Sequence, residues 1–184
     1  GRVLARSEVQ ERMKGIFSIR QEMVNLPTGQ AGGKKIDTIL PQAIRENTEQ
    51  DKELAVFRER LLGKPLPAIY FITLDGEKLD PGALKGKLLV LNFWFTACKP
   101  CITEIPHLNK LTEENKEKPV VFMAPAPETE AQIRKFLKKY PFNYTIIPSS
   151  LDYIQDLDVG NFPTHIVVDK EGIVRQVFIG YADD

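Results

Sequence analysis

An apolar run that ends in two closely spaced cysteines constrains this chain more than any other feature. Residues 88–95 read Leu-Leu-Val-Leu-Asn-Phe-Trp-Phe, and Cys98 and Cys101 follow at once. The run is too short to cross a membrane and precedes a helical pattern, which indicates a buried strand followed by a helix. Unpaired backbone N–H groups and the helix dipole stabilise a thiolate at a helix N-terminus, so the pattern predicts redox chemistry.

The composition narrows the kind of protein that carries this pair. The chain has only two cysteines, both in one tetrapeptide, so they cannot form the long-range disulfide framework of a small secreted domain. Lys plus Arg and Asp plus Glu balance at 25 each, which disfavours a broad basic surface, so we expect no nucleic-acid partner. A chain of 184 residues, 42% hydrophobic, has room for one full core and an appendage.

A proline-rich junction divides the chain into these two parts. Residues 63–67, Gly-Lys-Pro-Leu-Pro, end a helix and begin the main domain. We therefore expect a mostly helical or irregular N-terminal extension over 1–62 and a main domain over 63–184. The last helix of the extension is expected to pack on the domain through apolar residues at helical spacing, which are Leu54, Phe57, Leu61 and Leu62.

Alternating strand and helix patterns predict an α/β domain. The expected elements are a hairpin around Asp75-Gly76, strand 88–95, helix 99–116, strand 119–124, helix 130–140, strand 144–147, a brief helix capped by Ser150, and a hairpin around Glu171-Gly172. A βαβ unit followed by a hairpin implies a mixed sheet with helices on its faces.

Several motifs in this order resemble one family. The Asn92-Phe93-Trp94 strand, the Cys98-Lys99-Pro100-Cys101 tetrapeptide, Glu104, Pro106 and the Asn161-Phe162-Pro163-Thr164 segment together resemble the thioredoxin fold and, more narrowly, the TlpA/ResA-like thiol–disulfide oxidoreductases. The resemblance covers about 63–180. It implies a thioredoxin-like mixed β-sheet with flanking helices, and a redox-active Cys98–Cys101 disulfide that works without a bound cofactor.

Thiol–disulfide exchange gives each residue of the tetrapeptide a role. The reaction needs an accessible thiolate and a second thiol close enough to resolve the mixed disulfide. We assign Cys98 as the nucleophile, because it lies nearest the helix terminus, and Cys101 as the more buried resolving thiol. Lys99 by its charge, and Pro100 by restricting the loop, are candidates for tuning the thiol pKa. The alternatives are a permanently oxidised structural disulfide, two inert thiols and a zinc site, although the two histidines lack finger-like spacing.

Glu104 is the candidate proton acceptor. It lies three residues after Cys101, on nearly the same face of a helix. A glutamate at this place tunes the cysteines in the family that this chain resembles, which implies the same role for Glu104; the alternative is a solvated side chain near a helix start. Thioredoxin has an aspartate where this chain has Asn92, and an amide accepts no proton at ordinary pH. Proton transfer would therefore fall to Glu104 or water.

The resemblance also implies a substrate site distant in the sequence. An X-Pro bond is trans in most cases, but in this family the corresponding proline is cis and lies against the dithiol. The backbone of the preceding residue, Phe162, helps to bind an extended substrate peptide. We expect this role for Phe162 and Pro163, and a structural role as a helix kink for Pro106.

Three features depart from the family pattern. Ala97 stands where the family usually has a tryptophan. The loss of this aromatic side chain opens the site and leaves partner specificity undefined. His165 is either a satisfied, partly buried histidine, a modulator of thiol pKa or a metal ligand. The chain stops at 184, where the fold normally adds a helix, so either that helix is absent or another segment, such as the N-terminal helices, covers the sheet.

Three other functions were compared with disulfide exchange. A peroxiredoxin requires a hydroxyl residue three positions before its cysteine and a proline seven before, where this chain has Phe95 and Leu91, so this class is excluded. A copper module would use Cys98, Cys101 and His165 as soft ligands, although those relatives space their cysteines differently. A redox-inactive binding domain is disfavoured by the intact dithiol.

The sequence thus predicts a protein disulfide oxidoreductase, more a reductase than an oxidase. Its partners would be protein thiols or disulfides and a redox donor protein. The resemblance places it in the periplasm or exposed at the cell envelope, where a removed N-terminal segment would provide a membrane tether. The chain starts at Gly1 without an apolar signal segment, as a trimmed protein would. Direction depends on the reduction potential, which spans about −270 to −120 mV on this kind of motif.

Overall fold

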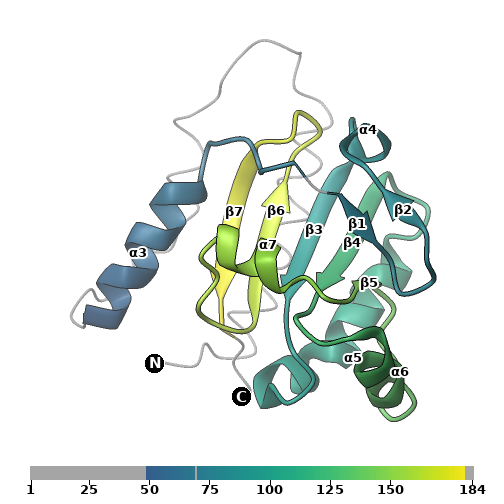
Figure 1. Cartoon of the computed structure of the whole chain (residues 1–184). Coiled ribbons are helices and arrows are strands. Elements are labelled where there is room, and N and C mark those ends of the chain that lie inside the picture. The colour runs from purple at the N-terminus through teal and green to yellow at the C-terminus, as the bar shows by residue number, and fades with distance from the viewer. Residues whose placement is uncertain (1–48, 69, 181–184) are drawn as a thin grey trace.

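A five-stranded mixed sheet with the order β5-β4-β3-β6-β7 forms the centre of the computed structural model (Figure 1). The structure describes residues 49–68 and 70–180. The predictions for residues 1–48, and for how the chain ends after residue 180, lie outside this part. No helix in the described part is long and apolar enough to cross a membrane.

The central strand of the sheet leads directly to the cysteines. β3 (Leu88–Phe93) is buried along its whole length, as expected for a strand that is covered on both faces. It pairs in parallel with β4 (Val120–Pro125) and antiparallel with β6 (Thr164–Val168). The outer strands are β5 (Thr145–Ile147), parallel to β4, and β7 (Val174–Ile179), antiparallel to β6. The prediction of a thioredoxin-like mixed sheet is confirmed.

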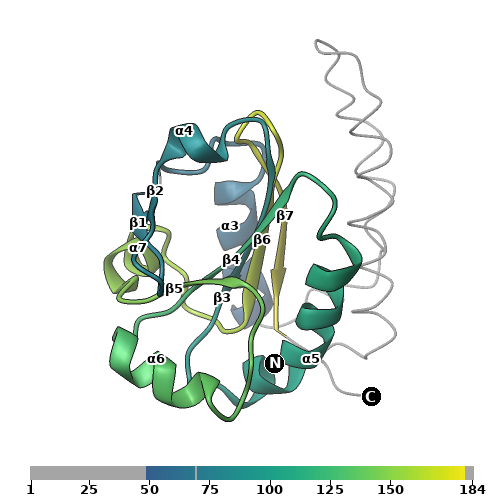
Figure 2. The ribbon, with the colours of Figure 1, turned by 90° about the vertical axis from the view of Figure 1, so that its right-hand side faces the viewer.

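Helices cover both faces of this sheet (Figure 2). α5 (Lys99–Glu114) packs on one face, and the apolar side chains of α6 (Glu130–Leu137) join the same core, which surrounds Trp94. α3 (Glu49–Leu61) and α7 (Leu151–Asp156) pack on the opposite face. Pro106 lies inside α5, which continues through it. The sheet therefore separates two apolar cores, and the cysteines belong to the core around Trp94.

The prediction that the last N-terminal helix packs on the domain is confirmed for α3, which contacts β7. Leu61 is buried, and Leu54 and Phe57 are half-buried. Leu62 was wrongly included in the apolar face. It follows the last residue of the helix and is 37% exposed, because the chain turns there and the Gly63 N–H donates to the Val174 carbonyl oxygen at 2.9 Å.

The first predicted hairpin is confirmed as a separate two-stranded sheet of β1 (Phe71–Ile72) and β2 (Lys78–Leu79). Gly76 has a φ of 81°, which the turn requires and glycine adopts without strain. A short helix, α4 (Pro81–Leu84), follows and was not predicted. Its signal is present in the sequence, because Asp80 caps the helix by accepting the Ala83 N–H at 3.0 Å.

The predicted cap of α7 is wrong in its chemistry. Ser150 occupies the N-cap position, but its side chain makes no capping hydrogen bond to the helix. The hydroxyl instead donates to the Ile147 carbonyl oxygen at 3.0 Å. Ser150 is buried, so its hydroxyl bonds to the chain leaving β5 rather than to the helix.

Candidate active site

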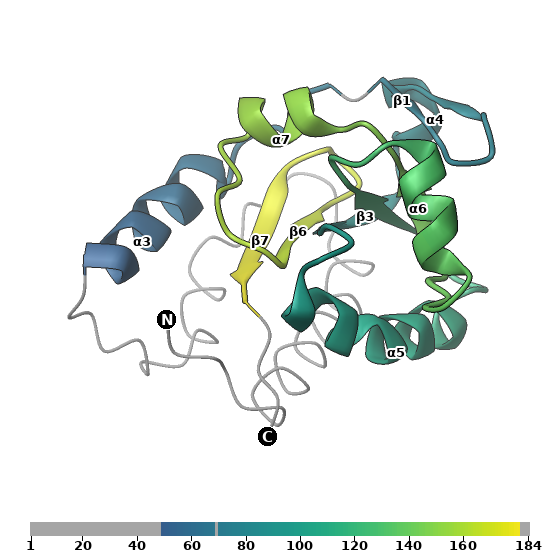
Figure 3. The same ribbon diagram turned by 60° about the horizontal axis from the view of Figure 1, so that its bottom comes forward.

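The two cysteines form a disulfide at the N-terminus of α5. Their Cα atoms are 5.3 Å apart. Figure 3 shows how the chain passes from the end of β3 through a short loop into α5. Cys98 is the N-cap residue, with φ −76° and ψ 101°, and its Sγ lies 3.3 Å from the Cys101 backbone N–H that donates to it. The location expected from the sequence, at the first turn of a helix, is therefore the location found.

The disulfide is largely hidden, whereas its immediate neighbours are exposed. Cys98 is 4% exposed and Cys101 is 1% exposed, so Cys101 is the more buried residue by a small margin in the oxidised form. Lys99, Pro100 and Ala97 are all exposed. Ala97, where the family usually has a tryptophan, thus leaves an open surface beside the disulfide.

A half-buried carboxylate that was not predicted from the sequence, that of Glu128, holds the loop before Cys98. The backbone N–H and the hydroxyl of Thr96 both donate to Glu128 Oε1, at 2.6 and 2.7 Å. Glu128 follows β4, and its carbonyl oxygen accepts the Ser149 N–H at 2.8 Å. Glu128 therefore ties the loop that carries the cysteines to the segment after β5.

The predicted substrate segment lies beside the same loop. The Phe162–Pro163 peptide bond is cis, the conformation that the resemblance implies. The Phe162 ring packs edge-on against Phe95, with ring centroids 5.2 Å apart. The Thr164 hydroxyl donates to the Asn161 carbonyl oxygen at 2.6 Å, which fixes the segment as it enters β6.

Three buried polar side chains meet on the side of β3 that faces α5. Asn92 Nδ2 donates to Glu104 Oε1 at 2.7 Å and lies 3.2 Å from His165 Nδ1. His165 Nε2 lies 3.1 Å from Glu104 Oε2. Asn92 and His165 are directly opposite each other in the β3–β6 register, whereas Glu104 reaches them from α5. We call Asn92, Glu104 and His165 the polar cluster.

The hydrogen bonds of the polar cluster assign the histidine tautomer. Asn92 Nδ2 carries two hydrogens, so it donates one to Glu104 and one to His165 Nδ1. His165 Nδ1 then accepts, and Nε2 carries the proton that it donates to Glu104. Asn92, Glu104 and His165 are 1%, 3% and 6% exposed, so the carboxyl group is buried and not solvated. The solvated alternative for Glu104 is wrong.

Two polar atoms around this cluster lack partners within the described part of the chain, Asn92 Oδ1 and the Tyr144 hydroxyl. Burial first, and the negative charge of Glu104 second, raise the pKa of Tyr144 well above its ordinary value. Tyr144 therefore stays protonated beside the carboxylate. Tyr144 was not predicted as part of the site, because it belongs to no motif in the sequence.

No group of three or more His, Cys, Asp or Glu side chains in the described residues is arranged to hold a metal ion. Both ring nitrogens of His165 lie within hydrogen-bonding distance of protein side chains. To bind a metal ion, His165 would have to give up its hydrogen bond to Glu104 or to Asn92.

Comparisons with known proteins agree with this geometry. A family model described as Redoxin matches residues 61–184. Thiol-disulfide oxidoreductase ResA of Bacillus cereus is 39% identical over 65% of this chain and 70% of its own length. Thioredoxin-like protein YneN of Bacillus subtilis is 33% identical over 64% and 71%. The solved thioredoxin domain of a thiol-disulfide oxidoreductase from Bacteroides vulgatus superposes with a TM-score of 0.58 and 26% identity, over 65% and 89%.

Proposed function

The chain belongs to the Redoxin family and is a TlpA/ResA-like thiol–disulfide oxidoreductase, and from this premise we propose that it reduces disulfides in partner proteins. The observation that carries the proposal is the Cys98–Cys101 disulfide at the start of α5, with the carboxyl group of Glu104 buried on the same helix. We also propose an extracytoplasmic location, periplasmic or exposed at the cell envelope. Disulfides persist in such oxidising compartments, and a reductase finds its substrates there.

The reaction begins with the reduced dithiol. The Cys98 thiolate attacks one sulfur of the substrate disulfide, a mixed disulfide forms, and the other substrate sulfur leaves as a thiolate that takes up a proton. Cys101 then loses its proton and attacks Cys98 Sγ, which releases the second substrate thiolate. Two electrons pass from the dithiol to the substrate, and the Cys98–Cys101 disulfide remains. A redox donor protein restores the dithiol, and no bound cofactor is needed.

Glu104 takes the proton of the resolving thiol in this proposal. It follows Cys101 by three residues on α5, and its carboxyl group is shielded from water. His165 donates to Glu104 through Nε2 and thereby modulates how readily the carboxyl group accepts a proton. Asn92 has no proton to exchange, so its part is to hold the other two side chains in position.

The residues around the disulfide provide binding and tuning. Lys99 is exposed next to Cys98, where its charge favours the thiolate, and Pro100, the second residue of α5, restricts the backbone of the first turn. The backbone of Phe162, before Pro163, is available to pair with an extended substrate chain.

A copper module remains the alternative that the sequence raised. It would use Cys98, Cys101 and His165 as ligands for Cu(I). No observation favours it, because His165 is hydrogen-bonded to Glu104 and Asn92. Titration of Cu(I) into the reduced protein and into His165→Ala separates the two proposals. Tight binding that is lost in the variant would favour the copper module over disulfide exchange.

Two cysteine variants and one titration test the proposed function. Cys98→Ser should abolish the reduction of insulin disulfides, and Cys101→Ser should accumulate mixed disulfides with partner proteins, visible on non-reducing gels. Turnover by Cys98→Ser would contradict the mechanism. An equilibrium titration against glutathione or dithiothreitol gives the direction: a potential near about −120 mV, that of a strong oxidant, would contradict a reductase.

A further inference from the structure

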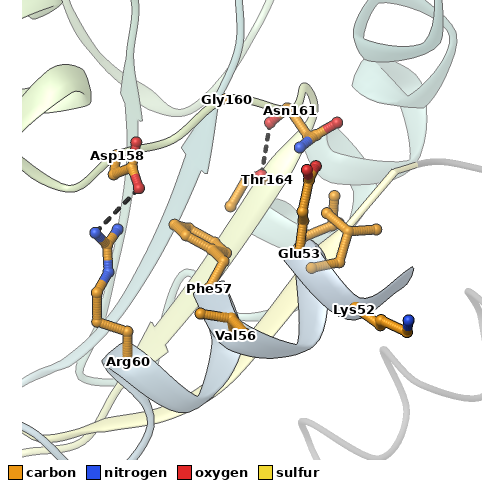
Figure 4. Close-up of a pocket in the computed structure, with 11 residues that line it drawn as sticks. Lys52, Glu53, Val56, Phe57, Arg60, Asp158, Gly160, Asn161 and Thr164 are labelled. Carbon is orange, nitrogen blue, oxygen red and sulfur yellow. Dashed lines mark hydrogen bonds and ion pairs between the residues drawn. The ribbon is translucent and has the colours of Figure 1, made fainter. Parts of the chain in front are cut away.

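A pocket lies beside the cis-proline segment, between α3 and the loop that leads into β6 (Figure 4). It has a volume of about 460 Å³. Its walls come from α3, from the loop with Asp158, Gly160 and Asn161, and from the two strands through Thr164 and Ile179. The disulfide exchange described above does not use this pocket, which we call the α3 pocket.

The lining of the α3 pocket favours an uncharged, apolar occupant. Leu54, Phe57 and Ile179 are half-buried and form an apolar surface, and Val56, which is 65% exposed, stands at its rim. Acidic and basic residues are present in equal number, so they give no net charge; these are Lys52, Arg60, Glu53 and Asp158. An apolar surface with a balanced polar rim is the usual lining of a binding site for an apolar group.

One end of the α3 pocket is closed by an ion pair. Arg60 Nη1 lies 3.0 Å from Asp158 Oδ2, and Arg60 Nη2 donates to the Leu157 carbonyl oxygen at 2.5 Å. The guanidinium also stands 5.6 Å from the centroid of the Phe57 ring. Figure 4 shows Glu53 pointing toward Asn161 at the other side and Lys52 pointing away. The contacts of Arg60 thus connect α3 to the loop that carries Asp158.

The α3 pocket and the proposed substrate site share one loop. Gly160 and Asn161 line the pocket and directly precede Phe162 and Pro163 in the chain. An extended peptide advances about 3.3 Å per residue, so a substrate paired with the Phe162 backbone carries its neighbouring side chains along this loop.

We propose that the α3 pocket binds a bulky apolar side chain of the substrate polypeptide, carried on the same extended segment as the cysteine being reduced. This inference rests on the proposed function and deepens it, because it defines the substrates as extended chains with an apolar residue near a disulfide cysteine. Folded proteins hide such residues, so the site selects segments that are locally unfolded.

Chromophoric peptides test the inference. Each peptide carries one cysteine in a mixed disulfide with 5-thio-2-nitrobenzoate, and leucine or serine stands at one of the five positions on either side. The reduced protein transfers two electrons to the mixed disulfide, releasing the coloured thiolate and the peptide thiol and leaving the Cys98–Cys101 disulfide. The wild type should prefer leucine over serine by about fivefold in kcat/KM at one position, the effect expected from partial burial of one side chain.

Two matched tryptophan variants locate the effect. Val56→Trp fills the rim of the α3 pocket and should abolish the leucine preference, while the rate with the glutathione mixed disulfide of the same chromophore stays unchanged. Ile72→Trp is the control: Ile72 is 59% exposed on β1 and does not line the pocket, so its preference should equal that of the wild type. Both positions are on the surface, so neither variant disturbs a core.

The possible results separate the two proposals. A wild type that reacts with the glutathione compound but shows no leucine preference would overturn the α3 pocket as a substrate site and leave the proposed function standing. A preference for leucine over serine that persists in Val56→Trp would also overturn the α3 pocket as a substrate site and leave the proposed function standing. Absence of reaction with every compound would contradict the proposed function, and the α3 pocket inference with it.

Discussion

Two buried carboxyl groups near opposite ends of β6 have different surroundings. Asp169, 2% exposed, accepts the backbone N–H groups of Glu171 and Ile173 at 3.0 and 2.8 Å and pairs with Arg175 Nε. Glu104, 3% exposed, is bonded instead to Asn92 and His165. The two groups are buried to the same degree, so burial does not distinguish their roles.

The difference lies in what the donors are able to do. Backbone amides and a guanidinium keep their protons at all ordinary pH values, so the donors around Asp169 only hold the β6–β7 turn. An imidazole ring is able both to donate and to accept a proton, so the partner of Glu104 is of a different kind. A buried carboxyl group with fixed donors stabilises structure, whereas one with a titratable donor is suited to chemistry.

The largest expected effect comes from removing Glu104, the proposed proton acceptor. Glu104→Gln keeps the size of the side chain but cannot take a proton, so the resolving step should slow by about 10²-fold, within the range of general acid–base catalysis. Stopped-flow fluorescence of Trp94 or quenched gel analysis of the mixed disulfide measures this step. Asp169→Asn is the matched control and should keep the wild-type rate. An equal loss of rate in Glu104→Gln and Asp169→Asn would contradict the difference in role between the two carboxyl groups.

Removing the structural carboxyl group should affect stability instead. Asp169→Ala leaves two backbone N–H groups and a partly exposed guanidinium without their acceptor, so the free energy of unfolding should fall by about 2–4 kcal/mol. Urea denaturation of the oxidised protein gives this value. Disulfide reduction at 25 °C should stay within about twofold of the wild-type rate, because Asp169 lies at the opposite end of β6 from the polar cluster. A large loss of activity in the folded variant would assign Asp169 to the active site.

A smaller change replaces the titratable partner. His165→Gln retains an amide donor for Glu104 but cannot pass on a proton during the reaction. The resolving step should therefore slow, by less than in Glu104→Gln and by about tenfold at most. Quenched gel analysis of the mixed disulfide measures this step. A rate equal to that of the wild type would show that His165 only fills space beside the carboxyl group.

The smallest effect concerns the hydroxyl beside Glu104. Tyr144→Phe removes a buried group that lacks a partner in the described part, so the protein should gain about 1 kcal/mol of stability. Because burial and Glu104 raise the pKa of Tyr144, the unfolded chain releases this proton first, and stability falls as the pH rises above about 10. Urea denaturation at pH 8 and 10.5 should show a smaller alkaline loss for the variant. A destabilised variant would indicate a hydrogen bond to the hydroxyl.

Local features of the site could be predicted from the sequence, whereas contacts between distant elements could not. The placement of Cys98 and Cys101 follows from a strand and a helix that are adjacent in the chain. Glu104 was identified from its spacing to Cys101 on one helix. Its contact with His165 was not, because it depends on the register of β6 against β3, which no local pattern reveals. Glu128 was missed for the same reason, since its bond to Thr96 joins two separate loops.

The antiparallel pairing of β3 with β6 has a consequence for how the protein matures. Asn92 and His165 are 73 residues apart and meet only when these strands close, and contacts of such long range form late because loop closure precedes them. A newly made chain therefore carries Cys98, Cys101 and Asn92 before His165 reaches Glu104. The surroundings of the proposed proton acceptor are complete only after β6 has paired with β3, so we expect full exchange activity only from the folded chain.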